Sequence, residues 1–158
     1  MKNISDVIEA YLKKVLQSSG KDIVEIKRSE IANRFECVPS QINYVINTRF
    51  TVEKGYIVES KRGGGGYIRI IRLKPKSKQA LLDEMLTVTN APMSQQTSMD
   101  LLERLYEENL LTKREAHLMN KVMHRDVLVV PLPDRDVVRA NIFRELILAL
   151  KVFDRQEG

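Results

Sequence analysis

The chain has 158 residues, of which 43% are hydrophobic and 30% charged, so it can bury a core and is not intrinsically disordered. No apolar run approaches the ~20 residues of a membrane span, and the single cysteine, Cys37, excludes an internal disulfide framework and suits the reducing cytoplasm. The net charge of +5 comes from residues 1–74, which carry 14 Lys and Arg against 8 Asp and Glu, because residues 75–158 carry 12 against 13. This asymmetry is typical of a nucleic-acid-binding module joined to a neutral domain, although a solvated basic face has the same composition.

The first half predicts an alternation of helices and strands, because stretches with helical spacing of apolar residues alternate with short β-branched runs. Ser29 and Ser40 stand where each can cap a short helix, and Pro39 favours a tight connection between the two helices. The expected elements in chain order are a helix over 4–16, a strand over 23–26, helices over 30–34 and 40–48, and strands over 56–62 and 67–72. Four consecutive glycines separate the last two strands and indicate a hairpin, so the order is that of a winged helix-turn-helix.

The second half predicts helices. Thr112 and Glu115 have the spacing of a capping box, and two prolines precede the last helix. The expected helices are 77–88, 97–108, one that follows Thr112, and 134–153. Apolar residues surround much of the last helix, so a monomer would expose many of them, and a subunit interface explains the pattern. We therefore predict an α+β protein with a winged helix-turn-helix DNA-binding domain at 1–74 and an all-α dimerisation and regulatory domain at 75–158.

The second short helix of the predicted helix-turn-helix has a polar, uncharged outer face. At about 100° per residue, Ile42, Val45 and Ile46 fall on one side and are expected to be buried. Amides and hydroxyls occupy the other positions, and such groups pair with base edges or with phosphates. A solvated polar face is the simpler alternative, but such a face usually carries Lys or Glu. We expect major-groove readout or positioning by Ser40, Gln41, Asn43, Tyr44, Asn47 and Thr48.

The hairpin tip is the more specific signal for DNA. A tip without side chains lets the backbone approach a narrow groove closely, and a neighbouring arginine can enter the minor groove. A flexible hairpin end needs fewer glycines, and a nucleotide-binding loop would continue with Lys-Ser/Thr and a helix. Ordering each glycine costs on the order of 1–2 kcal/mol of backbone entropy, so a bound tip becomes less favourable on warming. The predicted wing comprises Lys61, Arg62, Gly63, Gly64, Gly65, Gly66 and Tyr67.

Other residues that could carry chemistry have simpler interpretations. Arg28 and Arg49 flank the helix pair. The two interpretations for them are phosphate clamps and surface ion-pair residues. Cys37 is expected to be packed rather than redox-active, and His117 and His124, on one predicted helix, lack the neighbours of a metal site. No nucleophile–base pair stands out, so we expect no enzymatic activity, no cofactor and no metal.

The segments 29–32, 38–50 and 59–69 closely resemble the CtsR family of class three stress gene repressors, and the similarity continues through 109–112 and 135–136 to about Phe153. The resemblance implies a homodimeric, cytoplasmic repressor of heat-shock genes, chiefly those for Clp chaperone and protease components. It implies that the double-stranded operator DNA is a tandem direct repeat. RNA binding and a protein-interaction role are the alternatives that a winged helix leaves open.

The same resemblance implies how repression would be relieved. The glycine-rich wing is the temperature sensor in that family, which assigns sensing here to Gly63, Gly64, Gly65 and Gly66. The implied regulatory partners are a protein arginine kinase, its zinc-binding activator, and the Clp protease machinery that degrades the released repressor. Arg62 is implied as both a DNA contact and a phosphorylation target, since a phosphate would place ~1.5–2 negative charges against the DNA backbone.

Overall fold

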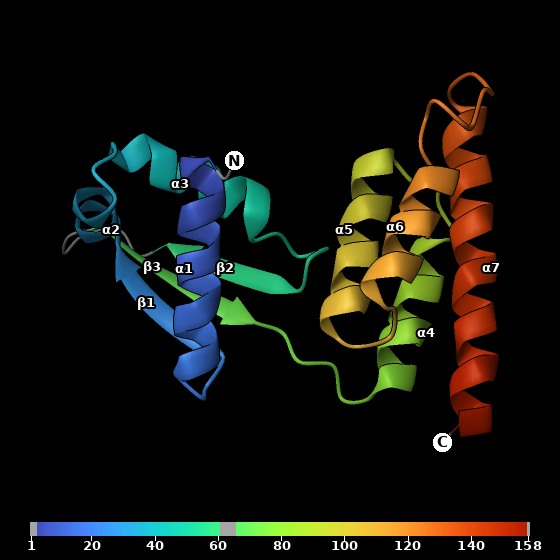
Figure 1. Cartoon of the computed structure of the whole chain (residues 1–158), viewed down its shortest axis with the longest axis horizontal. Coiled ribbons are helices and arrows are strands. Elements are labelled where there is room, and N and C mark those ends of the chain that lie inside the picture. Colours follow the sequence, from blue (N-terminus) through green and yellow to red (C-terminus); the bar gives the residue numbers. More distant parts are fainter. Residues whose placement is uncertain (1–2, 61–65, 158) are drawn as a thin grey trace. The chain divides into compact units, whose positions relative to one another are not determined.

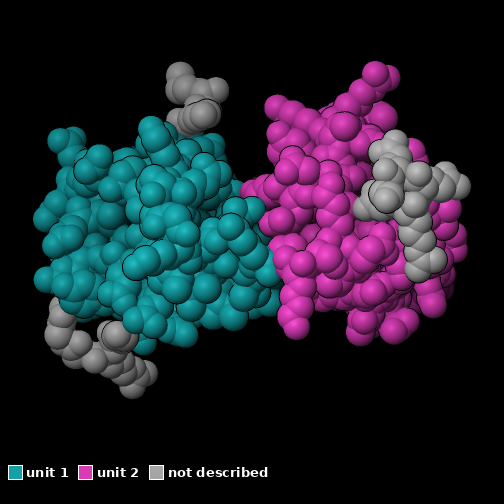
Figure 2. All heavy atoms as spheres, turned by 90° about the horizontal axis from the view of Figure 1, so that it is seen from below, with its two compact units in different colours: residues 1–74 teal, residues 75–158 magenta. Residues whose placement is uncertain are grey.

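A computed structural model describes residues 3–60 and 66–157, with side chains described up to residue 153. The chain divides into two compact units, residues 1–74 and 75–158, which Figure 2 colours separately. The first unit combines helices with an antiparallel sheet, and the second consists of helices over its described residues (Figure 1). The predicted α+β class is therefore confirmed. Within the described ranges, no helix combines the length and the apolarity that crossing a bilayer requires.

In the first unit, three helices pack on one face of a sheet with the strand order β1-β3-β2. Helix α1 crosses the sheet in Figure 1, and its residues Ile8, Leu12 and Leu16 share one core with the sheet residues Ile68 and Ile70. The first turn of α1 is capped by Asn3, whose Oδ1 accepts from the backbone N–H of Asp6 at 2.9 Å. The elements are α1 (Ile4–Ser18), β1 (Ile23–Lys27), α2 (Arg28–Arg34), α3 (Pro39–Arg49), β2 (Tyr56–Ser60) and β3 (Tyr67–Arg72).

The opposite face of the sheet carries charge. The register places Arg69 of β3 between Glu25 of β1 and Glu59 of β2. The Arg69 guanidinium lies 2.6 Å from the Glu25 carboxylate and 3.6 Å from that of Glu59. The hydrogen bond to Glu25 is the main cause that raises the pKa of Arg69 further above its usual range. Alternation along β3 thus separates an apolar core face from a salt-bridged outer face.

Two helix starts differ from the sequence prediction. Helix α2 begins at Arg28 and α3 begins at Pro39, and neither N-cap residue makes a side-chain cap hydrogen bond. Proline is favoured in the first turn because its ring fixes φ and its missing N–H would have no partner there. Ser29 and Ser40 therefore lie inside first turns rather than at cap positions. The turn between these helices brings Cys37 against the core, as predicted.

The second unit contains α4 (Lys78–Val88), α5 (Gln95–Glu107), α6 (Lys113–Val122) and α7 (Asp134–Glu157). The predicted capping box is confirmed: Thr112 Oγ1 accepts from the Glu115 N–H at 3.1 Å, and Glu115 Oε1 accepts from the Thr112 N–H at 2.8 Å. Helix α5 starts before the predicted Thr97 because Ser94 is its cap. Helix α6 ends at Val122, so His124 does not share the helix of His117, and that prediction was wrong.

One buried arginine connects three segments of the second unit. Arg139 of α7 is 1% exposed. Its Nε donates to the carbonyl of Met123 at 2.9 Å, and its Nη1 donates to the carbonyl of Met93 at 3.0 Å and to the Asp136 carboxylate. Because Met93 precedes α5 and Met123 follows α6, this side chain fixes the start of α5 and the end of α6 against α7.

Candidate nucleic-acid interface

Helix α3 is anchored through its apolar side. Ile42, Val45 and Ile46 are at most 3% exposed and belong to the core of the first unit, as predicted. Helices α1 and α2 supply other residues of this core, including Leu12 and Ile31. The buried side of α3 therefore fixes which side chains the helix can present to a ligand.

The outer face of α3 presents neutral polar groups. Ser40, Asn43, Asn47 and Thr48 are exposed, and Tyr44 keeps 55% of its surface accessible. The Thr48 hydroxyl donates to the Tyr44 carbonyl at 2.7 Å, so its oxygen is left as an acceptor. The face thus offers hydroxyl and amide groups without a negative charge, which suits contact with base edges and phosphates.

Gln41 belongs to the same helix but faces α1. Its side chain is half-buried, and Nε2 donates to the Ser5 Oγ at 2.7 Å. Ser5 itself is 5% exposed. The Gln41 amide therefore connects α3 to α1, a role that the helical spacing around Gln41 does not reveal because its partner lies 36 residues away in the chain.

Arg49 forms a salt bridge at the end of α3. Its Nη1 lies 3.0 Å from Asp6 Oδ1 and 2.8 Å from Glu9 Oε1, both on α1. Burial lowers the pKa of Arg49, but the hydrogen bonds and charges of the two carboxylates outweigh it, so the net shift is upward. The sequence left two interpretations for Arg49, a phosphate clamp or an ion-pair residue, and the structure contains the ion pair.

The Glu9 carboxylate should make stability sensitive to acid. Burial raises the pKa of Glu9, but Lys13 and Arg49 together bring it below its usual value of 4.5. When folding lowers the pKa of a carboxyl, its charged form stabilises the fold at pH values above the pKa of the unfolded state. This stability is lost as the pH falls through the pKa of the folded state. We expect Glu9→Gln to reduce the unfolding free energy at pH 7 by about 1 kcal/mol and to flatten its decline below pH ~4.5.

Denaturant unfolding across pH 3–7 measures this effect, with Glu53→Gln as the control because Glu53 is exposed after α3. Parallel pH profiles for the wild-type and Glu9→Gln proteins would contradict the assignment.

Arg28 lies where α3 approaches the base of the β2–β3 hairpin. Its Nε donates to the Asn43 Oδ1 at 2.6 Å. Its Nη2 donates to the Ser60 Oγ at 3.3 Å, and its Nη1 donates to the Gly66 carbonyl at 3.4 Å. The positive φ of Gly66, +72°, is one that a residue with a side chain rarely adopts. One guanidinium therefore contacts α3 and the residues on both sides of the hairpin tip.

The wing is described only at its base. Tyr67 is 37% exposed, and the Lys27 ammonium lies 5.3 Å from its ring centre. The predicted wing residues Lys61, Arg62, Gly63, Gly64 and Gly65 lie outside the described residues.

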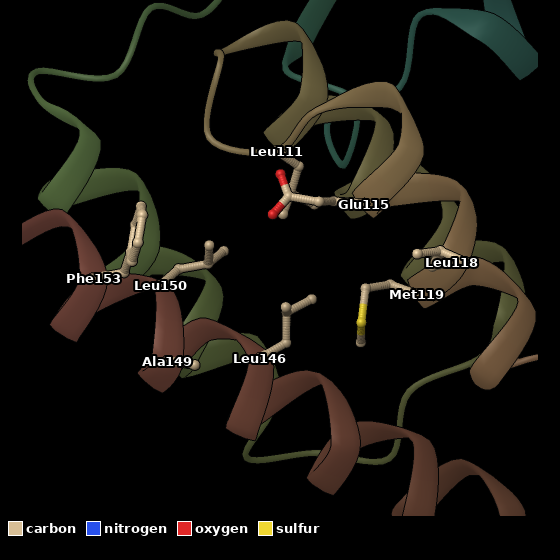
Figure 3. Close-up of a pocket in the computed structure, with 8 residues that line it drawn as sticks. All are labelled: Leu111, Glu115, Leu118, Met119, Leu146, Ala149, Leu150 and Phe153. Atoms are coloured by element: carbon tan, nitrogen blue, oxygen red, sulfur yellow. The ribbon is translucent and has the colours of Figure 1, made fainter.

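A separate apolar groove lies in the second unit, between α6 and α7 (Figure 3). The groove has a volume of about 390 Å³. Leu118 and Phe153, on opposite walls, are 53% and 55% exposed, and the Glu115 carboxylate projects into the opening. An exposed apolar groove of this kind is typical of a protein-binding surface. The other lining residues are Leu111, Met119, Leu146, Ala149 and Leu150.

Comparison with known proteins gives consistent matches over both units. Residues 3–74 match the family model of the CtsR N-terminal HTH domain, and residues 77–148 match that of the CtsR C-terminal dimerization domain. The transcriptional regulator CtsR of Geobacillus stearothermophilus is 58% identical over 96% of this chain and 99% of its own length. That of Bacillus subtilis (strain 168) is 55% identical over 95% of this chain and 97% of its own length.

A crystal structure of CtsR in complex with a 26 bp DNA duplex has the same fold. It is 58% identical in sequence and superposes with a TM-score of 0.84, covering 94% of this chain and 99% of the matched chain.

Proposed function

The chain belongs to the CtsR family of transcriptional regulators, and from this we propose that it is a repressor that binds double-stranded operator DNA as a homodimer. The observation that carries the proposal is the neutral amide and hydroxyl face of α3, held outward by a buried apolar side within a basic unit. The solved CtsR–DNA complex, which shares this fold, supports it. Because the family consists of transcriptional regulators, the expectation that the chain is not an enzyme is confirmed.

We propose a division of labour between the two units. Residues 1–74 bind DNA, and residues 75–158 form the dimer and receive regulatory signals. Ser40, Asn43, Tyr44, Asn47 and Thr48 face the major groove, a role that their exposure supports. Gln41 and Arg49 act through α1, because their polar atoms contact that helix.

The finer proposals rest on the family resemblance and on the wing sequence. We propose that Arg62 and the glycines 63–66 contact the minor groove, and that ordering these glycines makes binding weaken on warming. The target genes are heat-shock genes for Clp components, with tandem direct repeats as operators, and the protein acts in the cytoplasm. Phosphorylation of Arg62 by a protein arginine kinase with its zinc-binding activator, followed by Clp proteolysis, would release the operator.

Selection of bound sequences from random duplex DNA, at growth and heat-shock temperatures, tests DNA binding and its heat response. We expect a specific duplex to be enriched at the lower temperature and the enrichment to fall at the higher one. Arg62→Ala is expected to lower affinity for that duplex by roughly ten- to a hundredfold, the effect of losing a groove-contacting arginine. Lys21→Ala, which removes an exposed charge after α1, is the control.

Two outcomes would redirect the proposal. Duplex RNA that competes as well as the selected DNA would favour the RNA-binding alternative. Absence of DNA binding even at low salt would favour a protein-interaction role, because phosphate contacts strengthen as salt is lowered.

The groove between α6 and α7 supports the homodimer. Leu118→Glu would place a carboxylate in an apolar interface, where burying an unpaired charge is costly. We expect this variant to sediment as a monomer and to bind the operator at least about tenfold more weakly, because two linked units bind more tightly than one. His117→Glu, exposed on the same helix but outside the groove, is the control. A Leu118→Glu protein that remains dimeric would remove this groove from the interface.

A further inference from the structure

We propose that Arg28 sets the base preference of α3 by holding the Asn43 amide with its N–H₂ group outward, so that this position reads a hydrogen-bond acceptor on DNA. The proposal deepens the DNA-binding function proposed above and rests on it. It makes Arg28 a positioning residue and Asn43 the reading residue.

The chemistry of the contact decides which way the amide points. An arginine side chain has N–H donors and no acceptor, so its partner atom on Asn43 must be the carbonyl oxygen. That contact, Nε to Oδ1, measures 2.6 Å and joins α2 to the exposed face of α3. Arg28 takes one of the two lone pairs of Oδ1, so the N–H₂ group, with its two donors, is the larger part of the amide's hydrogen-bonding capacity left for a ligand.

This orientation restricts what Asn43 can recognise. An asparagine that pairs with adenine through two hydrogen bonds needs its oxygen to accept from N6 and its nitrogen to donate to N7. The contact to Arg28 takes one lone pair of that oxygen and holds the amide in one orientation, so the adenine pair is disfavoured at Asn43. The remaining partners for an N–H donor in the major groove are acceptors: guanine O6 and N7, adenine N7 and thymine O4.

Arg28 is itself held in place from the other side. Ser60 ends β2 and Gly66 precedes β3, and both accept hydrogen bonds from the guanidinium, at 3.3 and 3.4 Å. The backbone N–H of Arg28 also faces the Gly66 carbonyl, at 3.5 Å. Three of the five N–H donors of the side chain are thus directed to α3 and to the hairpin base. A guanidinium fork held at several points is rigid enough to orient the amide of Asn43.

A phosphate clamp is the competing role for Arg28. A substitution that keeps the positive charge distinguishes this role from orientation of Asn43. Lysine keeps the charge, and hence a phosphate contact, but its single ammonium cannot reproduce the fork that spans Asn43, Ser60 and Gly66. Arg28→Lys therefore distinguishes orientation of Asn43 from attraction to the DNA backbone.

The experiment compares base preferences from random-duplex selection for the full-length wild-type protein, Arg28→Lys, Arg28→Ala, Asn43→Ala and Asn43→Asp. We expect Asn43→Ala to identify the operator position that Asn43 reads. In the wild type, a base with a major-groove acceptor (guanine, adenine or thymine) should be favoured there about fivefold over cytosine, which presents a donor. Both Arg28 variants should lose this preference at the same position. Asn43→Asp should shift the preference toward cytosine, whose N4 donates to a carboxylate.

The preference is measured as the ratio of affinities for two duplexes that differ at that position. This ratio does not depend on the folded fraction of a variant, so partial unfolding of Arg28→Ala cannot mimic the expected result. Arg69→Ala, which removes an arginine from the salt-bridged outer face of the sheet, is the matched control and should keep the wild-type preference.

Two results separate this inference from the function on which it rests. An Arg28→Lys protein with wild-type preference, together with an Arg28→Ala protein that binds all duplexes more weakly and has a salt slope smaller by about one, would identify a phosphate clamp and overturn the inference. A wild-type protein that enriches no duplex sequence would overturn the proposed function as well.

Discussion

Replacing Asn47 with aspartate is expected to abolish specific operator binding, with an affinity loss above about a hundredfold. Asn47 is exposed on the outer face of α3, on the side of the helix away from the buried Val45 and Ile46. The substitution removes an amide that can donate to a base edge, which costs about 1–3 kcal/mol. It also brings a carboxylate toward the phosphates, and such like-charge juxtaposition costs several kcal/mol more.

Fold stability should hardly change in this variant, because an exposed surface substitution usually alters the unfolding free energy by less than about 0.5 kcal/mol. Fluorescence anisotropy with the selected duplex measures the affinity. Asn90→Asp makes the same charge change at an exposed position of the second unit and should bind as the wild type does. Equal losses in the two variants would show that net charge, not the α3 face, governs binding.

Replacing Arg139 with alanine is expected to destabilise the second unit by about 3–5 kcal/mol, the typical effect of removing one partner from a buried ionic network. The guanidinium is 1% exposed and donates to two backbone carbonyls and to Asp136. Its loss would leave the carbonyls of Met93 and Met123 without these donors and would open a cavity where the buried side chain now lies. Arg139→Lys should recover only part of the stability, since one ammonium cannot reach all three acceptors.

Hydrogen exchange measured by mass spectrometry reports on each unit separately. We expect faster exchange in α4–α7 of the Arg139→Ala protein and unchanged exchange in residues 3–60. Arg144→Ala, an exposed position on α7, is the control. Unchanged protection of the second unit would contradict the role assigned to Arg139.

The elements that could be predicted from sequence are those that depend on neighbours in the chain. Apolar spacing identified the buried side of α3, at Ile42, Val45 and Ile46, because a helix places such positions on one side wherever it is packed. The capping box of Thr112 and Glu115 was also predictable, since both of its hydrogen bonds close within three residues. The two β-rich runs on either side of the four glycines identified the hairpin for the same reason.

Periodicity and capping are local properties, so the order of elements in the α+β fold and the polar face of α3 follow from neighbouring residues alone. The partners of the long polar side chains, by contrast, depend on how the elements pack together. Gln41 and Arg49 contact α1, Arg28 contacts Asn43 beside the hairpin, and Arg139 joins the start of α5 to the end of α6. A long polar side chain has the same helical spacing whether it faces solvent, DNA or another helix. Its partner is set by how distant segments dock, which no local pattern records.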